Sequence, residues 1–314
     1  MRWYLASVIP LLTVMPSPVH AQDPAALSSR LAAMTAVSGF ERPVADTLLT
    51  LLPRAVRDRA GNVVEVLGTG QGGLLVTCPL DEVGYVVGEI RADGWVTLRR
   101  VGSGVDAGFD RWLQGERVTL WGRRGARAGV VAVRSVHLMR GRDRGAPPFT
   151  VDDALVDVGA RSAEDARALG IDVLTPVARE KVPLRYGDGR LAGPWVGRRS
   201  ACAALVGAAR AAHPTGRVVI AFVIEQQLGG RGLLTVMNTL GAFDRTILVD
   251  GKPGEFGALI VAADSGLSAR DRGLGSVSRL DLPIKYAGTP VETVSLADVR
   301  ALTDRLVDRI GGAQ

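Results

Sequence analysis

A polar run at the end of an apolar stretch is the part of the sequence best placed to carry chemistry. Residues 222–224 are apolar, Glu225, Gln226 and Gln227 follow, and a glycine-rich turn comes next. A buried strand of an α/β sheet ends in this way and delivers side chains to its carboxyl edge, where such folds place their sites. Carboxylates there could bind a metal ion or accept a proton, whereas amides do neither well. The Gln226-Gln227 pair therefore favours a polar strand end over a catalytic couple.

The composition indicates a packed, turn-rich α/β protein. Of the 314 residues 47% are hydrophobic and 39 are glycine, while aromatic residues at 5% argue against an all-β scaffold. The net charge of +6 is almost entirely arginine, because lysine occurs only at positions 181, 252 and 285. The densest basic run, residues 140–145, is interrupted by an acid and contains no aromatic residue, so no nucleic-acid partner is expected.

Residues 1–21 have the pattern of a secretory signal peptide. Arg2 is the charged start, residues 3–15 form the apolar core, and residues 19–21 resemble a cleavage site. The core is too short to span a bilayer, and prolines interrupt it. We therefore expect an exported protein, periplasmic or extracellular, that begins at Gln22 and has no membrane span after signal removal.

The two cysteines leave two possibilities open. In an exported protein Cys78 and Cys202 could form a disulfide. Both also lie in apolar segments, where buried free thiols are equally compatible with the sequence. Of the histidines beyond the signal, His137 lies in a turn-rich region and His213 between a predicted helix and strand.

The predicted elements divide the chain into a split α/β domain and an insertion. Residues 22–84 and 185–314 show helices and buried strands, whereas residues 85–184 show short β-like runs at regular spacing. The glycine-rich residues 68–73 are interpreted as a hairpin loop. Expected helices cover residues 24–36, 163–169, 201–212 and 297–310, with one ending near 52 and one starting near 232, and expected strands include 74–77, 218–224 and 246–249.

Several stretches in fixed order carry a family resemblance. They are residues 38–41, Asp58 with 61–63, 80–85, 156–160 with Ser162, 201–205, 229–232, and 285–286 with 289–292. Together they resemble the family 42 metallopeptidases, the TET-type aminopeptidases that include glutamyl and deblocking enzymes. The resemblance implies a three-layer, phosphorylase/peptidase-like α/β domain interrupted by a small β-barrel-like domain that helps to build oligomers. On that basis we expect a homo-oligomer, or a mixed oligomer with an active relative.

The chemistry implied by the resemblance needs two metal ions bridged by a carboxylate and a glutamate base. Of the positions that would supply these groups, only Asp250 keeps its acid. The two histidine positions, one of them beside Asp81, are occupied by Pro79 and Gly288, and the position of the bridging aspartate is occupied by Gly197. The base glutamate is replaced by Gln226 and a ligand glutamate by Gln227. We therefore expect no catalytic residue, no metal and no other cofactor. The chain is interpreted as an inactive homologue that acts in binding or assembly, with peptides as candidate ligands.

An active metallo-aminopeptidase with a rebuilt site is the alternative. It would hydrolyse N-terminal residues of peptides with two divalent ions such as zinc or cobalt. In an extended strand Glu225 would share a face with Gln227, and Asp81 and Glu82 could add oxygen ligands. No histidine is evident nearby, and no Gly-x-Ser-x-Gly motif supports a serine hydrolase.

Without metal ions, Asp250 and the nearby Asp81 need another positive partner. Arg198 is the candidate, because a guanidinium binds a carboxylate through two parallel hydrogen bonds, and Gly197 gives the backbone freedom to turn the side chain inward. The competing interpretation leaves both Arg198 and Arg199 in solvent at the rim of the pocket.

Overall fold

The computed structural model describes residues 23–106, 108–133, 148–263 and 273–313. The expected signal peptide, His137 and the basic run at 140–145 lie outside these residues. Within them, no helix combines the length and the apolar character that a bilayer crossing requires.

A mixed sheet forms the centre of the larger domain, in the order β1-β2-β12-β3-β13-β16-β14, with β15 on β16. Its strands are β1 (Val56–Arg57), β2 (Val63–Leu67), β3 (Thr69–Pro79), β12 (Gly216–Val223), β13 (Arg245–Leu248), β14 (Gly251–Pro253), β15 (Ile260–Ala263) and β16 (Ser276–Ile284). Strand β3 runs parallel to both β12 and β13. The carboxyl ends of these three strands therefore meet at one edge of the sheet.

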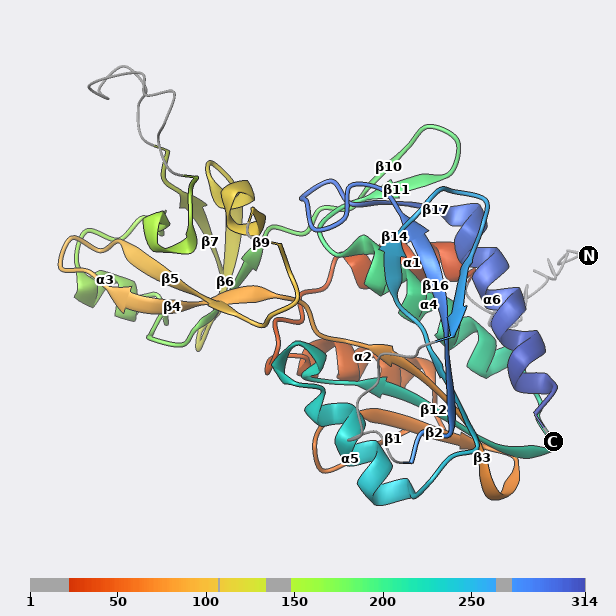
Figure 1. Ribbon diagram of the computed structural model, residues 1–314. Helices are drawn as coiled ribbons and strands as arrows, with labels where there is room; N and C mark the ends of the chain where they lie inside the picture. Colours follow the sequence, from red (N-terminus) through yellow and green to blue (C-terminus); the bar gives the residue numbers. More distant parts are fainter. Residues whose placement is uncertain (1–22, 107, 134–147, 264–272, 314) are drawn as a thin grey trace, which may run out of the picture.

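Helices cover both faces of this sheet (Figure 1). One face carries α1 (Pro24–Ala32), α2 (Arg42–Leu51), α4 (Val196–Ala211) and α6 (Leu296–Gly311), and the other carries α5 (Arg231–Leu240). The alternation in β12 explains both layers: Ile220 and Phe222 join the core beneath α4, whereas Val219 and Ala221 pack with α5. The expected three-layer α/β architecture is confirmed.

A closed barrel forms a separate lobe (Figure 1), in the order β4-β5-β8-β7-β6-β9. It comprises β4 (Gly84–Ile90), β5 (Val96–Val101), β6 (Arg117–Gly122), β7 (Gly125–Val131), β8 (Leu155–Asp157) and β9 (Pro176–Arg179), with short helices η1 (Phe109–Leu113), η2 (Val151–Asp153) and α3 (Ala163–Ala168). The barrel has its own hydrophobic core. The Ser162 side chain caps α3, as its sequence indicates, by accepting a hydrogen bond from Asp165.

A small third sheet consists of β10 (Leu184–Tyr186), β11 (Arg190–Ala192) and β17 (Thr293–Ser295). It follows the return from the barrel and leads into α4. Residues 293–295 thus connect this sheet to the start of α6.

The prediction of a hairpin loop at residues 68–73 is wrong. Strands β2 and β3 do not pair with each other, because β12 lies between them, antiparallel to β2 and parallel to β3. The glycines carry the chain across the end of β12. Gly68 and Gly73 have positive φ, and a Cβ on either would meet a backbone oxygen at the start of β12, at 2.0 Å and 2.2 Å respectively.

Candidate functional site

A cavity of about 450 Å³ opens at the carboxyl edge of the sheet. We call it the central cleft. The α/β domain contributes Pro79, Gln226, Gln227, Asp250 and Gly288 to its wall, and the connection between β5 and η1 contributes Gly104 and Asp106. The structure therefore brings together most of the positions that the family resemblance singled out.

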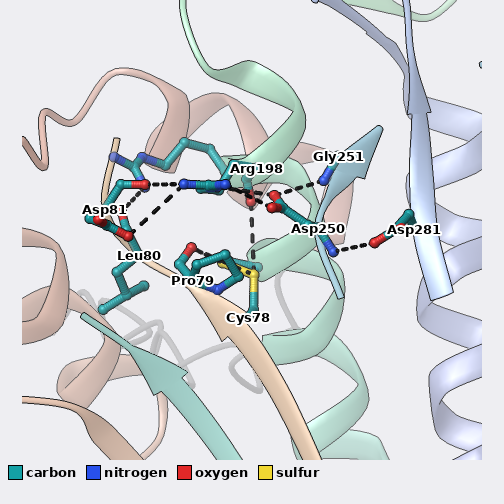
Figure 2. The surroundings of a disulfide bond; sticks show 10 residues. Cys78, Pro79, Leu80, Asp81, Arg198, Asp250, Gly251 and Asp281 are labelled. Carbon is teal, nitrogen blue, oxygen red and sulfur yellow. Dashed lines mark hydrogen bonds and ion pairs between the residues drawn. A yellow bond between two sulfur atoms is a disulfide. The ribbon is translucent and has the colours of Figure 1, made fainter. Parts of the chain in front are cut away.

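The floor of the cleft holds an arginine-aspartate pair (Figure 2). Nε of Arg198 donates to Oδ1 of Asp250 at 3.0 Å, and Nη2 donates to Oδ2 at 2.7 Å. Both residues are buried, with 8% of each exposed. The pairing expected from the sequence is present, and Arg198 does not lie in solvent.

The remaining donors of Arg198 are also engaged. Nη1 donates to the Asp81 carbonyl oxygen at 2.5 Å. With its amide oriented so that the oxygen faces the guanidinium, Gln227 accepts from Nη1 at 3.0 Å and from Nη2 at 3.2 Å, while its nitrogen donates to the Ser103 carbonyl. A guanidinium has five N–H groups, and these contacts use all of them.

Charge and burial act in opposite directions on this pair. Burial alone would raise the pKa of Asp250 and lower that of Arg198. Their mutual attraction and hydrogen bonds outweigh burial, so the pKa of Asp250 lies below its ordinary value and that of Arg198 above it. Both groups are therefore charged at neutral pH.

Asp81 holds the loop that carries the two glutamines. Its Oδ2 accepts from the Ser38 hydroxyl at 2.7 Å and from the backbone N–H of Gln227 at 2.8 Å. Its Oδ1 has no hydrogen bond and lies 3.9 Å from Nη1 of Arg198. Asp81 is thus part of the same network as Asp250, reached through Arg198.

Gly197 is needed for space. It lies in the first turn of α4, and a Cβ there would come within 2.6 Å of Cγ2 of Ile284 and 3.0 Å of Oε1 of Glu292. The expectation that this glycine supplies backbone freedom is wrong, because the residue is helical. The position has no room for an aspartate without movement of Ile284.

Glu292 closes the same corner of the cleft. It accepts from the N–H of Gly197 at 2.8 Å and from the N–H of Gly288 at 3.2 Å. Burial raises the pKa of this carboxyl, although the two N–H donors oppose the shift. Gly288 thus contributes a backbone donor where the family resemblance places a histidine.

The other acids considered from the sequence do not join the cleft floor. Strand β12 ends at Val223, Glu225 adopts a left-handed conformation with φ of 51°, and Gln226–Leu228 form the short 3-10 helix η3. The extended register assumed for Glu225 and Gln227 is therefore wrong. Glu225 pairs with Arg231 at 3.2 Å, and Glu82 is bound by Lys181 and Arg199 away from the cleft lining.

These donors do not fit a dinuclear metal centre. The only acid kept at a family ligand position is Asp250, and both of its oxygens accept from Arg198. Among the described residues no group of three or more His, Cys, Asp or Glu side chains is arranged to hold a metal ion. A metal at Asp250 would have to displace a guanidinium that is already fully hydrogen-bonded.

A disulfide joins Cys78 near the end of β3 to Cys202 in α4, directly beneath the Arg198 pair (Figure 2). Both cysteines are almost completely buried. Of the two possibilities left open by the sequence, the structure has the disulfide. It ties the strand end that carries Asp81 to the helix that carries Arg198.

Sequence reasoning missed two features of the site. Trp195 precedes α4 in a left-handed conformation, and its ring lies under the Arg198 guanidinium, 5.4 Å from Cζ to the ring centroid. The side chains of Lys181 and Arg199 are buried, and both form ion pairs with Glu82. The rarity of lysine in this chain was the one available signal for Lys181.

The comparisons with known proteins agree with this geometry. Residues 61–254 match the family model described as M42 glutamyl aminopeptidase. The chain is 30% identical over 212 residues to SgcX of Escherichia coli, named as a candidate aminopeptidase, and 29% identical over 204 residues to the lysyl aminopeptidase of Pyrococcus furiosus. These alignments cover 64% and 62% of this chain, and the chain spans 56% and 57% of the two relatives.

Solved structures show the same fold. An aminopeptidase from the archaeon Desulfurococcus kamchatkensis superposes with a TM-score of 0.81 at 18% identity, covering 94% of this chain and 96% of that one. The TET1 peptidase of Pyrococcus horikoshii superposes with a TM-score of 0.80 at 21% identity, covering 90% and 98%. With its matching core, inserted barrel and family-model match over more than half its length, the chain belongs to the M42 glutamyl aminopeptidase family.

Proposed function

We propose that this protein is an exported, non-catalytic member of the M42 family that binds peptides in the central cleft and works as an assembled oligomer. The observation that carries the proposal is the Arg198 guanidinium, which satisfies Asp250 and uses all of its donors within the protein. One organic cation therefore takes the place at Asp250 that a metal ion would need.

The proton-transfer step of peptide hydrolysis also lacks a group to perform it. The position of the base is Gln226, whose amide does not accept a proton at neutral pH. Asp250 is held ionised by Arg198 and is not available as a base. Glu292 is buried between two backbone donors that it already accepts from.

Binding is supported by the size and the walls of the cleft. A cavity of about 450 Å³ lies in the range of small-molecule and peptide side-chain pockets. Trp195, Phe109 and Ile284 offer apolar surface, and the amides of Gln226 and Gln227 lie beside them. The names of the relatives, such as lysyl aminopeptidase, suggest a peptide as the ligand.

Assembly is supported by the relatives and by the barrel surface. The TET1 peptidase of Pyrococcus horikoshii is described as a tetrahedron or a large octahedral shell, and a second structure as a dodecamer. The barrel of this chain exposes apolar side chains, among them Trp121 and Leu174. A homo-oligomer, or a mixed oligomer with an active relative, would cover them.

Four measurements on the purified protein test the proposal. Elemental analysis should find no stoichiometric zinc, cobalt or manganese, and a panel of aminoacyl anilides should not be hydrolysed. Trp195 lines the cleft, so peptide binding should change tryptophan fluorescence, and calorimetry should confirm it. Chelator-sensitive turnover would instead establish the rebuilt-site alternative.

Two further results bear on the same proposal. Gln226→Glu alone should not create turnover, because a base needs a water that metal ions hold and acidify. N-terminal sequencing of secreted protein should begin at Gln22. A chain that begins at Met1 would contradict export by a cleaved signal.

A further inference from the structure

The chain crosses between the two domains at two short connections. Residues 80–83 lead from β3 into β4, and residues 180–183 lead from β9 to β10. In Figure 1 these connections form the neck between the barrel lobe and the α/β domain. If the angle between the two domains changes, the backbone of these two connections has to bend.

Each connection carries one member of a buried charge cluster. Glu82 in the outgoing connection accepts from Nζ of Lys181 in the returning one at 2.7 Å, and Nη2 of Arg199 on α4 reaches the same oxygen at 2.7 Å. The side chains of Glu82, Lys181 and Arg199 are 1–3% exposed. We call these three residues the neck cluster.

Further hydrogen bonds tie the neck cluster to the α/β domain. Arg199 donates to the Leu80 carbonyl, and Lys181 donates to the Pro194 carbonyl at 3.1 Å. The backbone N–H of Glu82 donates to the Ala36 carbonyl at 2.9 Å. The cluster thus fixes both connections against the same part of the larger domain.

The neck cluster contains two cations and one anion. Arg179 of β9 and Tyr85 of β4 share a cavity of about 10 Å³ with Lys181, and Glu292 acts on the ammonium from a greater distance. Asp81 and Glu41 act in the same way on Arg199, and Arg198 opposes them. Burial is the largest influence on Lys181 and lowers its pKa to about 8, against the opposing attraction of Glu82. Arg199 remains charged, so Lys181 is the member that can lose a proton.

The cluster lies behind one wall of the central cleft. Phe109 of the barrel lobe and Trp195 of the α/β domain meet there with ring centroids 6.1 Å apart, and both line the cleft. The same two residues line the small cavity beside Lys181. A hinge movement at the neck would therefore separate Phe109 from Trp195 and widen the cleft.

We propose that the neck cluster is a proton-controlled hinge: with Lys181 protonated, burial of its ammonium away from water favours opening of the barrel, whereas with Lys181 neutral the cluster holds the barrel closed over the cleft. The inference rests on the proposed use of the cleft for binding. A neutral lysine amine still donates to Glu82 and to the Pro194 carbonyl, and Glu82 keeps Arg199 as its counter-ion.

The direction of the pH effect follows from linkage. In the closed form the pKa of Lys181 is about 8, whereas a solvated lysine has a pKa of about 10.4. Closing therefore releases a proton, and the closed population rises with pH across this window. The ratio of closed to open molecules should change by up to about two orders of magnitude, and it should be flat below the window.

Lys181→Met in the full chain is the test. Methionine keeps an apolar stem of similar length, removes the charge and leaves Glu82 matched one to one by Arg199. Hydrogen exchange of the amides at 80–83 and 180–183, corrected for intrinsic rates, should show protection that rises from pH 7 to pH 10 in the wild type. In Lys181→Met the protection should be high and independent of pH.

Matched variants separate this effect from general changes. Lys285→Met removes a half-buried, paired lysine of the α/β domain that lies outside the neck cluster, and this variant should keep the wild-type pH profile. Glu82→Gln leaves two buried cations without their anion and should lower neck protection at every pH. Small-angle scattering should give a smaller radius of gyration for Lys181→Met than for the wild type at pH 7.

Two outcomes would overturn the hinge: a pH profile that survives in Lys181→Met, or a Lys181→Met protein that is less protected at the neck, or unfolded, at pH 7. The second outcome would show that charged Lys181 holds the neck together. Fluorescence titration with peptides separates the two proposals, because loss of the binding role would abolish the titration in all variants and leave the exchange pattern as expected.

Discussion

Arg198 and Asp250 form a two-point contact, with Nε to Oδ1 at 3.0 Å and Nη2 to Oδ2 at 2.7 Å, which joins the first turn of α4 to the chain beyond β13. The N–H of Asp250 in turn donates to Oδ1 of Asp281 at 3.0 Å, so the pair also fixes β16. Because the contact joins segments far apart in sequence, it stabilises the fold. It also uses both carboxylate oxygens of Asp250, the one acid retained at a family ligand position.

Arg198→Ala and Asp250→Asn should each destabilise the protein by about 3–5 kcal/mol, because each leaves a buried charge without its partner. The double mutant should cost clearly less than the sum, since it removes both charges at once. Urea unfolding of the four proteins gives the coupling free energy. Additive costs would mean that the two side chains do not act as a pair.

The lowered pKa of Asp250 predicts how stability depends on pH. An acid with a folded-state pKa below its unfolded value of about 3.9 contributes stability that is present above that value and is lost as pH falls through the folded pKa. The free-energy difference between wild type and Asp250→Asn should therefore be constant above about pH 5 and shrink below about pH 4. Asp281 and Glu292 are present in both proteins, and burial is the main cause of their raised pKa values; the charge of Asp250 adds a smaller part that the substitution removes. A difference that grows on acidification would contradict the assignment.

Gly197→Ala should cost about 1–3 kcal/mol, because the new Cβ would lie 2.6 Å from Cγ2 of Ile284. Ile284→Ala in the same chain removes that contact, so the double mutant should cost less than the two single changes together. Gly311→Ala is the control: it also lies in a helix, and a Cβ there meets nothing within 4 Å. Thermal unfolding compares the four variants, and equal effects at positions 197 and 311 would count against the packing argument.

The fold was largely predictable because its signals are local. The apolar run at 218–224 and the Ser162 cap each specify an element from neighbouring residues, and both elements are present. The order of strands was not predictable in the same way. The glycines near Gly68 resemble a hairpin turn in sequence. In the structure β12, which begins at residue 216, pairs with both β2 and β3 and so lies between them.

The sequence was sufficient to predict which family site residues are replaced, but not how the remaining side chains are arranged. Chemistry alone indicated that Asp250 without metal ions needs a cation, and Arg198 is the neighbour that supplies it. No pattern around Glu225 predicts its left-handed conformation, which takes the residue off the strand. The neck cluster joins residues 82, 181 and 199, and no local pattern links positions so far apart.

The barrel exposes a leucine whose backbone conformation favours other residues. Leu174 is 65% exposed and has φ of 66°, a left-handed conformation that costs a side chain with a Cβ about 1 kcal/mol or more. Asparagine tolerates this conformation and is polar. Leu174→Asn should therefore leave the stability of the barrel unchanged or higher, while it removes apolar surface available for assembly.

If the barrel surface mediates self-association, Leu174→Asn should lower the mass per particle measured by light scattering during size-exclusion chromatography. Val66→Thr is the matched control, because Val66 is 50% exposed on β2 of the α/β domain and threonine keeps its β-branched shape. The control should elute like the wild type. An unchanged mass for Leu174→Asn, or an equal loss in both variants, would assign the association to a surface other than the one around Leu174.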